Sequence, residues 1–300
     1  RPRKIVSMSQ PAAFELDHTG VAVRDLDAAE AAYRRLGFNL TPRSIHSGSV
    51  EPGGPVVPWG SGNHCAMFAD GYLEIVGLTD PSLHSSVKTF LERYEGAHIV
   101  ALGSGDTDAT YKALSARSEG VKAPVRLQRD AAFGPDGAET RLAAFSNISI
   151  DSAFFPEGKL IFIEHLTRDV IWQPHLLEHP NGAVGLAEVG FCVEDVTATS
   201  AKLARLLDLE WKEVMPGVAR FTLPRGTIYV MNATAMAKWT PGVTPPAIPC
   251  VATIGFAVRD LDVTRSLLRD SGIAFTEHRY PALWIIPEYA CGPVVSFIQA

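Results

Sequence analysis

The chain has 300 residues, of which 46% are hydrophobic and 20% charged, a composition typical of globular proteins and a length that suits about two domains. No apolar run approaches the roughly 18 to 20 residues of a membrane helix, so we expect a cytoplasmic protein without a membrane partner. The 27 basic and 33 acidic residues give a net charge of −6 without a basic cluster, which argues against a nucleic-acid partner.

Four segments share one pattern, in which a short apolar strand is followed by an aspartate, an amphipathic helix and further strands. Residues 20–41 and 255–276 align without a gap and are identical at ten positions. A diverged copy starts at Gly190, and another is needed between Gly96 and Leu166. The aspartate can accept hydrogen bonds from free N–H groups at a helix start. The pattern predicts four βαβββ modules.

Clusters of proline and glycine separate the second module from the third. We therefore predict an N-terminal tail over 1–13, a first domain over 14–166, a linker over 167–184 and a second domain over 185–300.

An irregular stretch over residues 44–62 interrupts the first module. Its sequence, SIHSGSVEPGGPVVPWGSG, is too polar and broken for a helix or strand, and long loops of this kind are commonly lids or binding loops. Arg43, His46 and Asn63 flank or lie in this region, and we expect them to bind an anionic or carbonyl-bearing small molecule.

Ionisable side chains recur at matching places of the first two modules. His18 and His98 lie in the first strands, and Glu74 and Glu164 are centred in the last strands. Such side chains are costly to bury among apolar neighbours unless they share a partner. One divalent metal ion (Zn, Ni, Mn, Co or Fe) would be such a shared partner. Strand alternation lets only one of Glu164 and His165 face this site, and the alignment of the two last strands favours Glu164.

Three stretches resemble the vicinal oxygen chelate superfamily, and more narrowly its glyoxalase-like domain proteins. They are LDHTGVAVRDLDAAEAAYRRLGF (16–38), GYLEIVG (71–77) and HPNGA (179–183). The resemblance implies an α+β fold in which four βαβββ modules pair into two cupped-sheet domains.

The same resemblance implies one metal ion in the first cup. Its ligands would be His18, Glu74, His98 and Glu164, with Glu164 also taking the place of the catalytic carboxylate. In the third and fourth modules, Glu188 and Thr253 replace the first-strand histidine, and the last strands offer no carboxylate. We therefore expect no second metal site, and a C-terminal half that supports the first domain or mediates a homodimer.

Three functions fit these observations. The first is a metal-dependent lyase or isomerase of the glyoxalase type, which acts on a small oxygenated molecule through a chelated enediolate-like intermediate, with Glu164 carrying the proton. The others are a non-catalytic small-molecule binder of the antibiotic-sequestering kind and an Fe(II) or Mn(II) ring-cleaving dioxygenase of the extradiol type. The substrate, the use of glutathione and the oligomeric state stay open.

Overall fold

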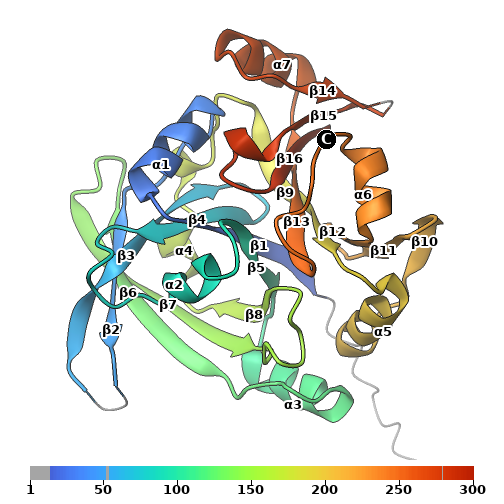
Figure 1. Cartoon of the computed structure of the whole chain (residues 1–300). Coiled ribbons are helices and arrows are strands. Elements are labelled where there is room, and N and C mark those ends of the chain that lie inside the picture. Colours follow the sequence, from blue (N-terminus) through green and yellow to red (C-terminus); the bar gives the residue numbers. More distant parts are fainter. Residues whose placement is uncertain (1–13, 52–53, 279) are drawn as a thin grey trace, which may run out of the picture.

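The computed structural model describes residues 14–51, 54–278 and 280–300 as two eight-stranded sheets flanked by helices (Figure 1). The strand order is β2-β3-β4-β1-β5-β8-β7-β6 in the first sheet and β10-β11-β12-β9-β13-β16-β15-β14 in the second. Each sheet is made of two βαβββ modules, so the predicted α+β fold is confirmed. The predicted tail over 1–13 lies outside the described residues.

The first sheet and its helices occupy the N-terminal half of the chain. Its strands are β1 (Glu15–Val23), β2 (Ser44–Ser49), β3 (Val56–Met67), β4 (Tyr72–Leu78), β5 (Gly96–Gly103), β6 (Val125–Phe133), β7 (Glu139–Ser149) and β8 (Lys159–His165). The helices are α1 (Leu26–Arg35), α2 (Val87–Leu91) and α3 (Thr107–Arg117), followed by α4 (Arg168–Ile171) and η1 (Pro174–Leu176) between the sheets.

The second sheet repeats this arrangement. Its strands are β9 (Ala183–Cys192), β10 (Lys212–Met215), β11 (Val218–Thr222), β12 (Thr227–Met231), β13 (Cys250–Val258), β14 (Thr276–Glu277), β15 (Ala282–Ile285) and β16 (Val294–Gln299). Its helices are α5 (Val196–Leu207), α6 (Ala233–Trp239), α7 (Leu261–Asp270) and η2 (Pro287–Tyr289).

An aspartate caps the first helix of every module. The side chains of Asp25, Asp106, Asp195 and Asp260 each accept a hydrogen bond from a backbone N–H in the first turn of the following helix. This confirms the helix starts that the repeated sequence predicts, and it gives a fixed reference point for comparing the modules.

The two modules of each sheet join through their first strands, which run antiparallel at the sheet centre. Gly20 of β1 lies opposite Ile99 of β5, and a Cβ at Gly20 would come within 2.7 Å of the Ile99 side chain. Gly255 of β13 gives the same room to Glu188 of β9. The glycine that recurs in the repeat thus leaves space for a side chain of the partner module.

The prediction of an irregular loop over 44–62 is wrong, because most of this stretch belongs to the paired strands β2 and β3. A register shift between Ile45 and Ser47 accommodates the irregular sequence. At Gly62 a Cβ would lie 2.5 Å from the Ser44 carbonyl oxygen, so glycine permits a close approach of the two strands. The glycines and prolines that suggested a loop are part of an edge hairpin.

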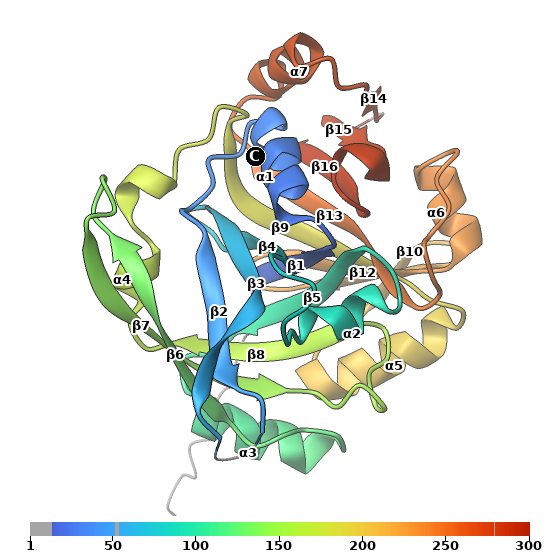
Figure 2. The ribbon, with the colours of Figure 1, turned by 60° about the vertical axis from the view of Figure 1, so that its left-hand side comes forward.

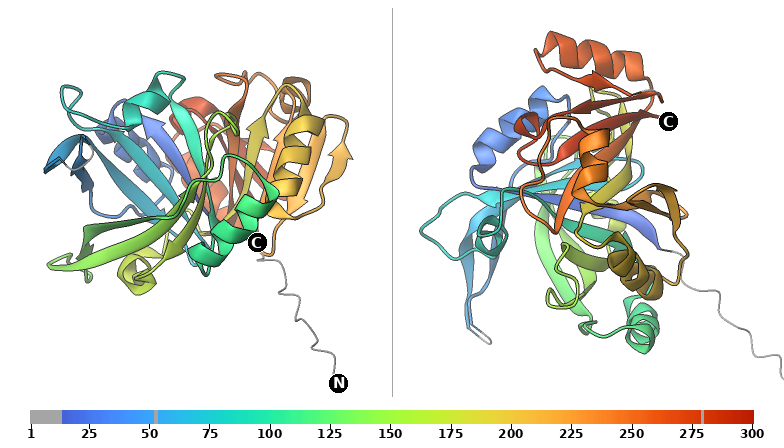
Figure 3. Two further views of the ribbon diagram at one scale, coloured as in Figure 1. Left: turned by 90° about the horizontal axis from the view of Figure 1, so that it is seen from below. Right: turned by 45° about the vertical axis from the view of Figure 1, so that its right-hand side comes forward.

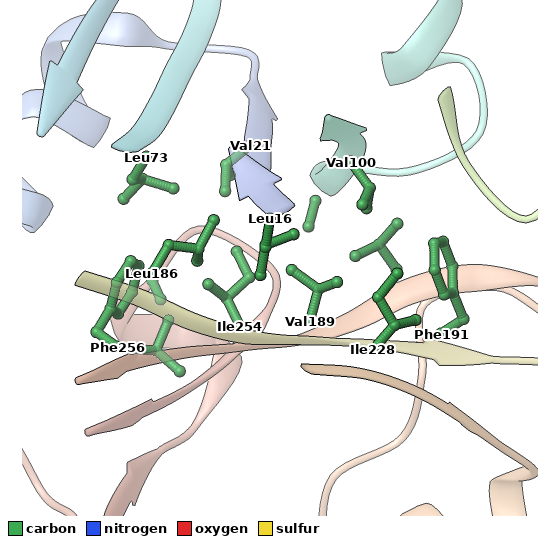
Figure 4. Packing of buried hydrophobic residues seen from close by; sticks show 14 of the residues in the cluster. Leu16, Val21, Leu73, Val100, Leu186, Val189, Phe191, Ile228, Ile254 and Phe256 are labelled. Atoms are coloured by element: carbon green, nitrogen blue, oxygen red, sulfur yellow. The ribbon is translucent and has the colours of Figure 1, made fainter. Parts of the chain in front are cut away.

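The two sheets pack against each other through the faces opposite their cups (Figure 4). Apolar side chains of β1, β4 and β5 meet those of β9, β12 and β13 in the largest hydrophobic core. The residues in contact there include Leu16, Val21, Leu73, Val100, Leu186, Val189, Phe191, Ile228, Ile254 and Phe256. The two halves therefore share this core, and Figure 3 shows the N-terminal half (blue to green) beside the C-terminal half (yellow to red).

None of the helices in the described part of the chain is both long and apolar enough to span a lipid bilayer.

Candidate functional site in the first cup

Two adjoining cavities lie on the concave face of the first sheet. The central cavity, of about 190 Å³, is lined by residues of β1, β3, β4, β5, β6, β7 and β8. The edge cavity, of about 240 Å³, lies between β2, β3, β6 and the segment containing α4 and η1. Asn63, Cys65, Arg129 and Ile171 line both cavities. The two cavities are therefore neighbouring parts of one site.

The sheet curls so that its two edge strands approach each other at this site. Arg129 of β6 donates a hydrogen bond of 3.3 Å from a guanidinium nitrogen to Ser44 Oγ of β2. Figure 2 shows β2 passing close to β6 and β7, with α4 beyond them. The curled sheet thus has the cupped shape that the family resemblance implies.

His18 lines the central cavity and is fixed by two neighbours. Its Nδ1 donates to Asp17 Oδ1 over 2.8 Å, and its ring stacks on Tyr72 with 4.3 Å between the ring centres. With Nδ1 protonated, the Nε2 atom of the neutral ring is the one that can accept a proton. The geometry resembles that of a histidine oriented by a buried carboxylate.

Asp17 also binds a second histidine. His165 Nε2 donates to the carboxylate of Asp17 at 3.1 and 3.2 Å, and its ring packs edge-on against Trp172 at 4.8 Å between centres. Burial alone would raise the pKa of Asp17, but the hydrogen bonds from His165 and His18 hold it well below its usual value. Asp17 is therefore ionised at any physiological pH and accepts hydrogen bonds from both rings.

Glu74 reaches the same cavity from β4. Asn63 Nδ2 donates to its Oε1 atom over 2.7 Å, which fixes the carboxylate. Cys65 of β3 pairs with Glu74 in the strand register, and burial raises the pKa of its thiol to about 12. The thiol is protonated at neutral pH, so Cys65 is a poor nucleophile.

His98 does not join this group. The first strands pair Gly20 with Ile99 and then Val21 with Ala97, so His98 is the extra residue of a β-bulge. Its Nε2 lies 2.9 Å from the Tyr94 carbonyl oxygen and its ring stacks on Tyr94 at 4.0 Å. Burial lowers the pKa of His98 to about 4, so the ring is neutral.

The helix caps explain this difference. His18 lies seven residues before the cap Asp25, whereas His98 lies eight before the cap Asp106. Ile99 therefore takes the place that corresponds to His18, and it lines the central cavity. Aligning His98 with His18 is wrong by one residue, which reverses the direction of a strand side chain.

Glu164 is also placed differently from the expectation. Its Oε2 accepts hydrogen bonds of 2.9 Å from both the backbone N–H and the hydroxyl of Thr107, at the first turn of α3. Its neighbour Ile163 lines the central cavity, and its neighbour His165 binds Asp17. Alternation along β8 thus directs Glu164 to a helix start, where a carboxylate is favourable.

A four-ligand metal centre does not fit the donors of this cup. Of the expected set, only His18 and Glu74 line the central cavity, and the module-two positions that correspond to them hold Ile99 and Ile161. No group of three or more His, Cys, Asp or Glu side chains within residues 14–51, 54–278 and 280–300 is arranged to hold a metal ion. We therefore derive no chemical step through a metal.

The three expected substrate-binding residues have different surroundings. Asn63 lines both cavities. Arg43 lines the edge cavity, but its guanidinium forms ion pairs with Asp27 and Glu30 of α1. His46 lies 3.1 Å from the Ser61 hydroxyl, and burial lowers its pKa. It is not among the residues that line either cavity.

Sequence reasoning missed four ionisable residues in or beside the cup, which are Asp17, Arg129, Lys159 and His165. Asp17 directly precedes His18, and His165 directly follows Glu164, so each is next to a residue that the sequence pattern indicates. Arg129 lies in a stretch to which no strand was assigned. There Val125 and Leu127 alternate with polar residues just before Arg129, a pattern that is the usual signal of a strand.

Comparisons with known proteins agree with this fold. Residues 16–207 match the model of the family described as glyoxalase-like domain. A search of curated proteins finds no match.

Several solved structures share the fold at 12 to 15% sequence identity, which concerns the fold alone. One is a hypothetical protein from Staphylococcus aureus, with a TM-score of 0.61 and 12% identity over 96% of this chain and 100% of that chain. A mutant of 4-hydroxymandelate synthase from Streptomyces coelicolor has a TM-score of 0.57 and 13% identity over 97% and 93% of the two chains. A xylose isomerase-like TIM barrel/4-hydroxyphenylpyruvate dioxygenase fusion protein has a TM-score of 0.57 and 15% identity over 99% and 51%.

The family match spans more than half of the chain, and the paired βαβββ modules have the architecture that the resemblance implied. The chain belongs to the glyoxalase-like domain family of the vicinal oxygen chelate superfamily.

Proposed function

We propose that the first cup binds a small oxygenated organic molecule and catalyses a proton transfer on it, a reaction of the lyase or isomerase class. The observation that carries this proposal is the pair of His18 and Asp17, in which a cavity-lining imidazole is held by a buried, ionised carboxylate. A histidine in this setting is suited to general acid and base catalysis.

In the proposed reaction, His18 Nε2 takes a proton from a substrate carbon next to a carbonyl group. The C–H electron pair moves to the carbonyl oxygen, which gives an enolate, and Asp17 stabilises the imidazolium that forms. The proton then returns from His18 to a neighbouring atom of the substrate. Asn63 and Arg129 line the cavity and can donate hydrogen bonds to the charged oxygen.

Glu74 has a different part in this proposal. Because Asn63 holds one of its oxygens, the carboxylate is fixed in the cavity wall, two residues along β4 from Tyr72, the stacking partner of His18. It can accept a hydrogen bond from a substrate hydroxyl and so orient an oxygen next to the reacting carbon.

Solvent exchange tests the proposal directly. The protein would be incubated in D₂O with a panel of 2-oxo and 2-hydroxy acids, and deuterium uptake at carbon would be followed by proton NMR. His18→Gln should reduce the rate at least a hundredfold. His84→Gln is the matched control, since His84 is exposed and packs edge-on against Trp59, and neither residue lines the two cavities. Equal rates for the His18→Gln variant and the wild type would refute the proposal.

A second candidate is the non-catalytic binder. The aliphatic side chains of Ile99 and Ile161 favour it, because they line the central cavity at positions where polar groups would be needed to assist a reaction. A protein that binds members of the panel in a calorimeter but exchanges no proton of any of them would support this candidate instead. The ring-cleaving dioxygenase loses support, because His98 faces Tyr94 and does not complete a set of two histidines and a carboxylate.

A further inference from the structure

Arg129 lies where the two cavities of the first cup meet. It projects from β6, is half-buried, and lines both the central and the edge cavity. The guanidinium stands 6.0 Å from the ring centre of Phe145, and its bond to Ser44 uses only one of five N–H donors. Its positive charge is felt by Cys65 and Tyr72, which both line the central cavity.

This guanidinium has no carboxylate partner among the residues that the structure describes. Arg43 also lines the edge cavity, but its charge is already paired with Asp27 and Glu30. A half-buried cation loses part of its hydration, and a bidentate anion is the partner that best restores its hydrogen bonds. Arg129 therefore has the chemistry of an anchor for a carboxylate ligand.

The two cavities differ in character on either side of Arg129. The central cavity holds His18, Glu74 and Asn63, which are polar. The edge cavity is lined by several apolar side chains, which are Met67, Ala131, Val170, Ile171 and Leu176. A ligand anchored between them can extend an apolar body into the edge cavity while its carboxylate end stays near the polar groups.

We infer that the ligand of the first cup is an organic acid with an apolar body, whose carboxylate binds Arg129 and whose body lies in the edge cavity. The inference rests on the proposed function for the use made of the acid, since Arg129, which would hold the carboxylate, lines the same central cavity as His18. Binding itself does not depend on proton transfer. Arg129 brings positive charge to the cup, as does Lys159 in the central cavity. Ile99 and Ile161 hold the module-two positions that correspond to His18 and Glu74, so they offer no ligands for a metal ion.

Hexanoate, 1-hexanol and hexylphosphonate are suitable probes, because they share the chain and differ in the head group. Dissociation constants would be measured by NMR titration of the full chain. Wild-type protein should bind hexanoate at least tenfold more tightly than 1-hexanol, as expected for a charge-assisted hydrogen bond. Equal affinity for acid and alcohol would overturn the inference, and tighter binding of the phosphonate would replace the carboxylate by a phosphate-like group.

Variants locate the anchor. Arg129→Gln should remove the preference for hexanoate over 1-hexanol, and Arg129→Lys should keep part of it because the charge is retained. Arg126→Gln is the matched control, since Arg126 is exposed on the same strand and lines neither cavity. Melting curves check that each variant is folded. An unchanged preference in folded Arg129→Gln would refute the anchor.

His18→Gln separates this inference from the proposed function. It should bind hexanoate within about twofold of the wild type. If wild-type protein prefers hexanoate but exchanges no proton of any acid, the anchor stands and the proton-transfer proposal fails. If exchange occurs and depends on His18 while Arg129→Gln leaves the affinity for hexanoate unchanged, the anchor fails alone.

Discussion

The two sheets are built from the same modules, but different side chains fill their cups. Seven residues before the first helix cap, the first sheet has His18 and the second has Glu188, and the strand register puts Tyr229 where the first sheet has Glu74. The first cup contains two cavities. In the second, α6 packs Met236 into a cluster with buried residues of β9, β11, β12 and β13. One backbone arrangement can therefore serve a ligand site or a packed support, depending on a few side chains.

Making the first cup resemble the second should have the largest effect on its chemistry. His18→Glu should lower proton exchange at least a hundredfold, because a carboxylate next to Asp17 is repelled and lacks the basicity of imidazole. The reciprocal Glu188→His should leave exchange unchanged. Deuterium uptake measured by NMR checks both, and exchange that survives in His18→Glu would mean that the first-strand residue does not distinguish the cups.

The shared core predicts that the halves unfold together. Leu16 is fully buried between the sheets, and Leu16→Ala should lower the free energy of unfolding by about 2 to 5 kcal/mol. Leu142→Ala is the control, because Leu142 is 49% exposed on β7. Urea unfolding followed by circular dichroism and by tryptophan fluorescence should give one coincident transition. Two separate transitions would show that each sheet is stable alone.

Glu188 makes the second cup sensitive to pH. Burial raises the pKa of its carboxyl to about 7, against 4.5 for an unperturbed glutamate. Between these values the folded chain keeps a proton that the unfolded chain has released, so the contribution of Glu188 to stability falls as pH rises and is lost above about pH 7. Its size is on the order of 3 kcal/mol.

Urea unfolding at several pH values checks this contribution in Glu188→Gln. The amide does not titrate, so the variant should gain stability relative to the wild type as pH rises from 4.5 to 7. A difference between the two proteins that is constant over this range would show that Glu188 ionises freely in the folded chain.

The smallest effect concerns Glu164. Glu164→Gln weakens the bonds to Thr107 at the start of α3 and should cost about 1 kcal/mol, with proton exchange unchanged. The role of ligand and proton carrier that the family resemblance implies for Glu164 predicts the opposite result, a loss of exchange with little change in stability. Thermal melts and NMR exchange on the same sample decide between them.

The sequence predicts the architecture because the features that build it are local. The aspartate caps recur in all four modules, and the glycine five residues before the cap recurs in three of them, so comparing the modules reveals the repeat. The hairpin of β2 and β3 escapes this reasoning, since its strands depend on pairing with β4 and on close approach at Gly62. Local propensity is a weak guide where pairing decides the structure.

The candidate site could be predicted only in part. His18, Glu74 and Asn63 line the cavities as residue type and strand position suggest. His98 and Glu164 do not, because the direction of a strand side chain depends on register, and a single extra residue in β5 reverses it. Residue identity gives the chemistry of a position, but the pairing of strands decides which cavity it serves.

The bulge in β5 has a consequence for how such cups change. Ile99 pairs with Gly20 and lines the central cavity, and His98 is the residue directly before it. Deleting Ile99 would shift His98 into that pair and add a second imidazole to the cup without any substitution. The loss of one codon would therefore turn a histidine that packs outside the cup into one that could contact a ligand. Two homologous chains of nearly equal composition can then differ in the side chains of their cups because one chain is a residue shorter.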